Sequence, residues 1–147
     1  MKLRYIILIL LVVPSVLGVK AQQTNKQFVN KVQSQRIAFF TQRMEITPAE
    51  AQKFWPLYNE YTQKKNALSD EKNKLTKAYK ANSATMTESE VDATIQKYVS
   101  LAKQETELLE DYNKKFRSVL PAQKVMKLYL AEFEFKEWLL KQIREKG

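Results

Sequence analysis

Carboxylates are the side chains in this sequence that come nearest to suggesting an active site. A cluster of them falls on two segments with helical periodicity: Glu105, Glu107, Glu110, Asp111, Glu132 and Glu134. Helices of a bundle can hold two metal ions between such groups, but the familiar sites also use Glu-x-x-His motifs. The chain has no His. We therefore interpret these carboxylates as solvated helix faces with lysine partners four residues away, such as Lys114 for Glu110.

Other reactive side chains and loops are also missing from the composition. The chain has no Cys and no His, so it lacks the usual ligands of zinc, copper and nickel and the commonest general base. Its two glycines, Gly18 and Gly147, lie near the ends, which excludes glycine-rich loops that cradle phosphate. The sequence predicts a protein that is not an enzyme and that uses no cofactor and no metal.

The N-terminus predicts export. Two basic residues precede an almost unbroken apolar run, Tyr5–Leu17, which has the length of a signal-peptide core and is short for a membrane span. Small residues in Val19–Ala21 predict cleavage before Gln22, and Gly18 ends a second possible site. An uncleaved anchor is the alternative. We expect residues 1–21 to be a signal peptide, residues 22–147 to be one domain, and the mature protein to be periplasmic.

The charge of the predicted mature chain limits its partners. It has 22 basic residues against 16 acidic ones, a net charge of +6. A basic protein suits nucleic acid, anionic lipid or acidic protein surfaces. Export makes nucleic acid the least suitable of the three, and no RNA-binding motif is present. We therefore predict protein partners and no nucleic acid.

Two capping boxes mark the starts of two long helices. Thr47 is followed by Glu50, and Thr87 is followed by Glu90, each three residues later. In this motif the Thr side chain and the Glu side chain each bond to the other's backbone N–H. Pro48 follows Thr47 at the first helical position, where the missing N–H costs nothing. The chain therefore predicts helix starts at both sites.

Periodicity predicts four helices, over residues 25–44, 47–80, 87–119 and 121–146. Pro121 is expected at the first position of the last helix, and Pro56 is expected to bend the second one near Gln52. The second helix repeats apolar residues every seven positions: Phe54, Tyr61, Leu68 and Leu75. The third helix follows steps of four and three: Val91, Ile95, Tyr98, Ala102, Glu105, Leu109, Tyr112, Phe116 and Val119.

These seams predict an all-α fold, an elongated four-helix arrangement built on a long antiparallel hairpin. Glu105 interrupts the apolar seam, and we expect it to pair with Lys65 or Lys72, a partly exposed ion pair. A polar switch that tunes opening is the alternative. The fourth helix is apolar over so wide an arc that part of it fits a homodimer contact.

Basic and aromatic residues predict a binding surface for proteins. The candidates are Phe39, Phe40, Met44, Tyr58, Lys64, Lys65, Lys72, Lys114, Lys115 and Arg117. A positive surface of this kind would steer acidic partners or unfolded segments. The alternative explanation of the lysines is solubility alone.

The segment Arg36–Tyr61 resembles the exported helical proteins of Bacteroidetes called "sensor of ECF-type sigma factor", which are similar to the Spy/CpxP group. That group has two LTxxQ-like helix starts, whose counterparts here are Ile46–Glu50 and Leu120–Gln123. Both depart from the pattern, since Glu50 replaces Gln and Pro121 replaces Thr. The detailed match covers about 25 residues, with Phe54–Tyr58 its most specific part.

The resemblance implies a cradle-shaped helical dimer in the periplasm. It also implies one of two functions, and both remain open at this point. The first is an ATP-independent chaperone, or holdase, of the envelope stress response that shields unfolded or envelope proteins. The second is a dedicated regulator that docks on a membrane-bound stress sensor.

Overall fold

The computed structural model describes the backbone of residues 17–145 and the side chains of residues 30–145. The apolar run of the predicted signal peptide lies almost wholly outside these residues. The chain divides into two units, residues 1–37 and 38–147, which we describe separately. In the first unit the described backbone is a single helix, and the second unit holds the remaining elements.

The described residues form an all-α fold, as the sequence predicts. The helices are α1 (Leu17–Met44), α2 (Pro48–Asn82), α3 (Glu88–Val119) and α4 (Ala122–Arg144), and the described part of the chain contains no strand. None of these helices has the length and apolar character needed to cross a membrane. The bounds agree closely with the predicted ones, except that α1 begins eight residues before position 25. Pro121 is the residue just before α4, not its first residue.

Both capping boxes are confirmed. The backbone N–H of Thr47 donates to Glu50 Oε2 at 2.8 Å, and the N–H of Glu50 donates to the Thr47 hydroxyl at 3.3 Å. Thr87 and Glu90 make the same two bonds, at 2.7 and 3.4 Å. Each box satisfies backbone donors that the first helical turn leaves unpaired. They fix the starts of α2 and α3.

Pro56 lies inside α2, which continues through it as one helix from Pro48 to Asn82. Pro has no N–H and cannot donate to the carbonyl one turn earlier, that of Gln52. The rest of the long helix offsets this missing bond. The bend near these residues remains a prediction.

A tight corner joins α1 to α2. Glu45 adopts a positive φ of 51°, which is uncommon for a residue with a side chain. Its N–H donates to the carbonyl of Gln42, and the N–H of Ile46 donates to that of Thr41. Two lysines of α4 hold the corner, because Lys124 donates to the Glu45 carbonyl at 2.8 Å and Lys127 to its carboxylate at 2.7 Å.

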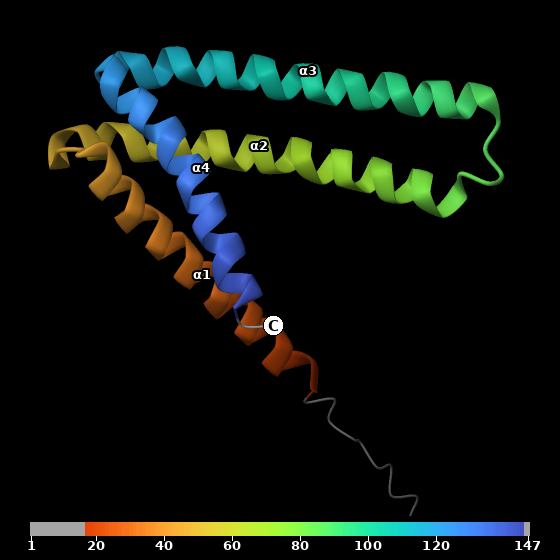
Figure 1. The fold of residues 1–147 in the computed structure, drawn as a ribbon, viewed down its shortest axis with the longest axis horizontal. Helices are drawn as coiled ribbons and strands as arrows, with labels where there is room; N and C mark the ends of the chain where they lie inside the picture. Colours follow the sequence, from red (N-terminus) through yellow and green to blue (C-terminus); the bar gives the residue numbers. More distant parts are fainter. Residues whose placement is uncertain (1–16, 146–147) are drawn as a thin grey trace, which may run out of the picture. The chain divides into compact units, whose positions relative to one another are not determined.

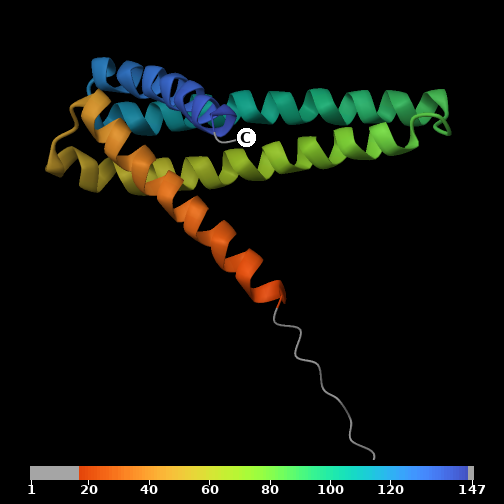
Figure 2. The same ribbon diagram turned by 60° about the horizontal axis from the view of Figure 1, so that its bottom comes forward.

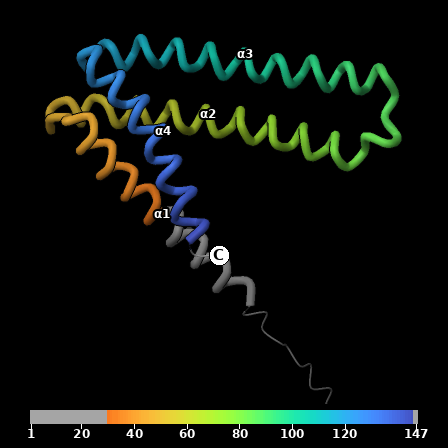
Figure 3. The backbone as a smooth tube through the Cα atoms, in the orientation of Figure 1, coloured from red at the N-terminus to blue at the C-terminus, as the bar shows by residue number. Residues whose placement is uncertain are grey.

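In the second unit, α2 and α3 form the predicted antiparallel hairpin. Figures 1 and 2 both show the two helices side by side along their lengths, which agrees with the contacts between them. The connection over residues 83–87 lies at the end of the hairpin farthest from α4 (Figure 3). We call this end distal. The proximal end, where α2 begins and α3 ends, is crossed by α4.

Aromatic rings fill the proximal end. We define the aromatic core as the buried residues Phe54, Tyr58, Tyr61, Tyr112 and Phe116. The ring centroids of Phe54 and Phe116 are 5.5 Å apart, and those of Tyr61 and Tyr112 are 5.4 Å apart. Such tilted and edge-on pairs add to the free energy of burial. The rings tie α2 to α3.

A second layer covers the aromatic core. Phe40, near the end of α1, packs edge-on against Tyr58 at 5.6 Å and against Phe135 of α4 at 6.0 Å between centroids. Met44 and Leu128 beside them are completely buried. The end of α1 and α4 therefore complete the burial of the aromatic core, which the hairpin alone would leave partly exposed.

The predicted seam of α3 is partly wrong. Tyr112 and Phe116 face α2 as expected, but Leu109 is 39% exposed. Leu101, which the predicted seam leaves out, is fully buried, and Leu108 is half-buried. On a helix, residues three or four positions apart lie on one side, so a series of such steps can pass from one face to the next. The predicted seam therefore combined residues of the buried face with residues of an adjacent exposed face.

Candidate binding surface

The lysines of the predicted surface are mostly engaged with the hairpin. Lys64 Nζ donates to Glu60 Oε1 at 2.7 Å and to the hydroxyl of Tyr112 at 3.1 Å. Its hydrogen bond to Glu60 is the main reason that the pKa of Lys64 is raised. Lys115 places its ammonium 4.2 Å from the centroid of the Tyr112 ring. Tyr112 thus brings together two of the predicted cations.

The predicted ion pair inside the seam is confirmed for Lys72. Its Nζ lies 2.5 Å from Glu105 Oε2, and both side chains are partly exposed. The hydrogen bond to Glu105 raises the pKa of Lys72, and the ammonium also lies 5.8 Å from the centroid of the Tyr98 ring. Lys65, the other predicted partner, instead lies 3.8 Å from Glu132 of α4.

Three aromatic or sulfur-containing candidates were assigned wrongly. Phe40, Met44 and Tyr58 are at most 3% exposed, so they belong to the core and not to an accessible surface. The Tyr58 hydroxyl donates to Glu132 Oε1 at 2.9 Å, which links α2 to α4. Phe39 is half-buried, and the Arg43 guanidinium lies 5.2 Å from its ring centroid.

The remaining candidates are exposed but scattered. Lys114 lies 3.8 Å from Asp111, not beside Glu110 as predicted, and Arg117 is an exposed side chain in the last turn of α3. Fully exposed pairs of this kind contribute little to stability. The ten predicted residues therefore do not form one binding surface.

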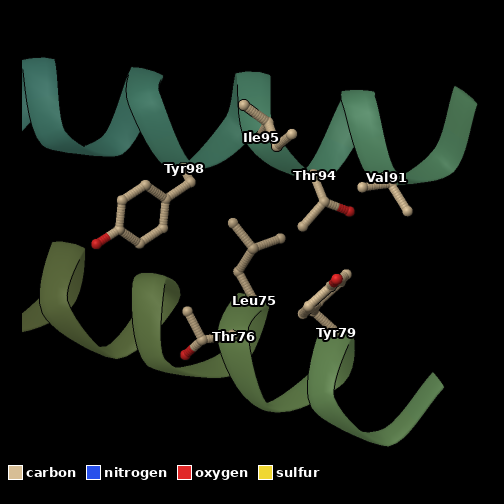
Figure 4. A pocket seen from close by; sticks show the side chains of 7 residues that line it. All are labelled: Leu75, Thr76, Tyr79, Val91, Thr94, Ile95 and Tyr98. Atoms are coloured by element: carbon tan, nitrogen blue, oxygen red, sulfur yellow. The ribbon is translucent and has the colours of Figure 1, made fainter. Parts of the chain in front are cut away.

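An apolar groove lies instead at the distal end of the hairpin. It has a volume of about 310 Å³ and runs between α2 and α3 (Figure 4). We call it the distal groove. Its lining residues are Leu75, Thr76, Tyr79, Val91, Thr94, Ile95 and Tyr98. The volume lies at the lower end of the range typical of ligand sites.

The chemistry of the distal groove is almost purely apolar. The Thr76 hydroxyl donates to the carbonyls of Lys72 and Asn73, and the Thr94 hydroxyl donates to that of Glu90. Both hydroxyls are satisfied by their own helices, so neither is needed by a ligand. The groove suits apolar side chains, because a polar group placed there would lose its hydrogen bonds to water.

The groove continues into an exposed stripe on α3. Ile95 is 53% exposed and Val99 is 58% exposed, four residues apart and on the same side of the helix as Leu109. We call these three residues the α3 stripe. Val99 was missed from the sequence because it lies outside the predicted seam. The signal for it was the apolar repeat at positions 95, 99, 102 and 109, which also has helical spacing.

The described carboxylates do not gather into a metal site. Within residues 30–145, no three carboxylates lie close enough together to hold a metal ion. The polar groups nearest the distal groove are ammonium, carboxylate and phenol side chains of the hairpin itself, and Lys72 and Glu105 pair with each other. The distal groove therefore presents mainly apolar side chains, and its two threonine hydroxyls are bonded to their own helices.

Comparison with protein-family models, with curated proteins and with solved structures finds no match for this chain. The resemblance to the Spy/CpxP group thus remains a prediction from the sequence, as do the cradle and the dimer. What the geometry contributes is a helical hairpin with an aromatic core at one end and an open apolar groove at the other.

Proposed function

We propose that this chain is an exported, non-enzymatic binding protein that shields unfolded polypeptides, an ATP-independent holdase of the bacterial envelope. The observation that carries the proposal is the distal groove together with the α3 stripe. Large apolar side chains are exposed there on a well-formed hairpin, although a monomeric protein usually exposes apolar residues singly. A surface of this kind is stabilised when it covers apolar segments of other chains.

The charges around this surface favour weak and broad binding. Basic side chains occur along α2, and acidic ones follow the start of α3, such as Glu88 and Asp92. Neither sign dominates, and few polar groups are placed to select one sequence. Specificity requires shape and polar matching, which an open apolar surface supplies poorly. Clients would therefore be chosen by exposed apolar residues and not by sequence.

The test is suppression of aggregation. We expect the chain beginning at Gln22 to slow the aggregation of several unrelated, chemically denatured proteins without ATP, measured by light scattering. Ile95→Ser with Val99→Ser should weaken this activity, because both residues lie on the accessible surface of α3. Lack of protection at every molar ratio would contradict the proposed holdase function.

A matched control separates the binding surface from general surface change. Lys97 and Lys103 lie on α3 in exposed ion pairs with Glu71 and Glu107. Lys97→Ser with Lys103→Ser changes the same helix without removing apolar area, so protection should be unaffected. Equal losses in both double variants would show that the α3 stripe is not the client surface.

The second candidate is a dedicated regulator that docks on one membrane-bound stress-signalling protein. The size of the distal groove favours it, because about 310 Å³ accommodates a few side chains and not a long unfolded segment. Photocrosslinking from position 95 in cells discriminates the two functions. A holdase gives many crosslinked proteins, whereas a dedicated regulator gives one.

A further inference from the structure

A line of large apolar side chains runs along the outer side of α4. Met126, Leu130, Phe133 and Leu140 follow helical steps of four, three and seven and are each between 47% and 61% exposed. We call them the α4 outer stripe. The opposite side of α4 carries its buried residues: Val125, Leu128, Ala131 and Phe135. The helix is thus apolar on two opposite sides, and the hairpin and α1 explain only one of them.

Cations accompany this stripe along its length. Lys127, which also pairs with Glu45, follows Met126, Lys136 lies one turn after Phe133, and Arg144 lies one turn after Leu140. Long basic side chains can lay their methylene groups along an apolar surface while the charged end stays in water. The pattern is a band of apolar residues edged by ammonium and guanidinium groups.

Two of the three carboxylates of α4 have partners on other helices. Glu132 accepts a hydrogen bond from Tyr58 and pairs with Lys65, and Glu134 lies 3.0 Å from Arg43. These contacts hold both carboxylates against α2 and the end of α1. Glu137 is the one carboxylate whose spacing places it within the α4 outer stripe, so its replacement tests what covers the stripe.

A second copy of the chain meets like charges when α4 pairs with itself over its full length. In an antiparallel helix pair with Met126 opposite Arg144, the flanking Lys127 faces Lys141 of the other copy. In a parallel pair, Lys136 faces Lys141 of the other copy. Like charges at these flanking positions oppose pairing. A surface with negative charge meets the cations that edge the stripe without this repulsion.

We propose that the α4 outer stripe binds the surface of an anionic lipid membrane, with α4 lying in the plane of the interface. Helices that bind in this way have an apolar face with Phe and Leu and a polar border rich in Lys and Arg. The predicted mature charge of +6 adds attraction to a negative lipid surface. A flat bilayer needs no matching groove, so it can cover an exposed stripe on an outer helix.

This site goes beyond the proposed holdase function and does not depend on it. The distal groove and the α3 stripe lie on the hairpin, whereas the α4 outer stripe lies on the helix that crosses it (Figure 1). Binding through α4 would keep the protein at the membrane surface and leave the distal groove available to clients.

The test is co-sedimentation of the chain from Gln22 onward with lipid vesicles. This start is used because the apolar run Tyr5–Leu17 would itself enter lipid. We expect binding to vesicles of phosphatidylcholine with phosphatidylglycerol, weaker binding to phosphatidylcholine alone, and release by added salt. Leu130→Ser with Phe133→Ser should lower the partition coefficient about tenfold or more, since two large apolar groups no longer enter the interface.

Matched variants make the result specific. Ile95→Ser with Val99→Ser removes similar exposed apolar area from α3 and should leave vesicle binding unchanged. Glu137→Gln should strengthen binding to the anionic vesicles, and Lys136→Glu with Arg144→Glu should weaken it. Circular dichroism shows whether each variant keeps its helices.

Several outcomes would overturn the proposal. They are absence of binding to either vesicle, equal binding by the α4 double variant and the unaltered chain, and loss of binding in the α3 double variant instead. A dimer in sedimentation velocity that the α4 double variant converts to a monomer would assign the stripe to a second copy. None of these outcomes affects the aggregation assay, which contains no lipid, so failure of one proposal is distinguishable from failure of the other.

Discussion

The two ends of the α2–α3 hairpin contain the same kinds of apolar residue, yet they pack very differently. At the proximal end Phe54 and Phe116 are fully buried, whereas Tyr98 at the distal end is 45% exposed. The difference comes from a third layer. The end of α1 and α4 cover the proximal end, and within residues 38–145 no helix covers the distal one. Two helices alone do not bury their shared seam.

An ion pair lies between these two regions. Lys72 and Glu105 meet in the seam between the aromatic core and the distal groove. An apolar pair at this position would join the two regions into one continuous core. The charged pair interrupts the apolar seam between the two regions.

The comparison predicts its largest effect for Phe116→Ala. Phe116 contacts all four other rings of the aromatic core, so its removal leaves a cavity and should cost about 3–5 kcal/mol of unfolding free energy. Tyr79→Ala at the distal end is the control and should cost less than about 1 kcal/mol, as at other exposed positions. Urea unfolding measures both. Similar losses would mean that the two ends contribute equally to stability.

A second pair of variants compares the buried and the exposed face of α3 with one kind of substitution. Leu101→Ala should cost about 2–5 kcal/mol, because Leu101 is fully buried. Leu109→Ala should cost less than about 1 kcal/mol, because Leu109 lies on the α3 stripe. Thermal unfolding of both proteins checks the assignment. The reverse order would restore the predicted seam and remove Leu109 from the binding surface.

Much of the fold was predictable because its signals are local. The two capping boxes predict helix starts through bonds within one turn, between Thr47 and Glu50 and between Thr87 and Glu90. The ion pair between Lys72 and Glu105 was also predictable, because two long antiparallel helices fix the register of their seams. Each of these features depends on spacing along the chain or on one helix pair.

The binding surface was not predictable in the same way. Phe40 and Tyr58 are chemically suited to a surface or to a core, and only the covering layer of α4 decides that they are buried. The same layer leaves Met126 and Leu130 exposed, and the apolar pattern of the fourth helix does not single out these two residues. Burial depends on where the fourth helix crosses the hairpin, and no local pattern encodes that crossing.

A smaller effect distinguishes the two capping boxes. Thr47→Ala should cost about 1 kcal/mol, since it removes the side-chain acceptor at the start of α2. Thr87→Ala removes the equivalent bond at the distal end, where the helix start can fray without opening the aromatic core. We expect a lowered melting temperature for the first variant. For the second, we expect faster amide exchange near residue 90 with a smaller change in melting temperature.

The acid response should be the smallest of these differences, because Glu90 is exposed and Glu50 is only partly buried. A hydrogen bond from Lys124, followed by that from the Thr47 N–H, lowers the pKa of Glu50 from its ordinary value of 4.5 to about 2. The pKa of Glu90 is also lowered, chiefly by the backbone N–H of Thr87. Glu90 has no bond to a lysine among the described contacts.

The sign follows from proton binding. Between pH 4.5 and pH 2 the unfolded chain binds a proton at Glu50 and the folded chain does not, so stability falls as the pH falls through this range. Lys124→Met removes the largest cause and should flatten the decline, measured by urea unfolding across these pH values. Lys97→Met removes a lysine of an exposed pair at the distal end and should leave the slope unchanged. If both variants change the slope of stability against pH equally, the effect does not come from Glu50. The capping box at the proximal end would then contribute no more to the acid response than an exposed pair at the distal end.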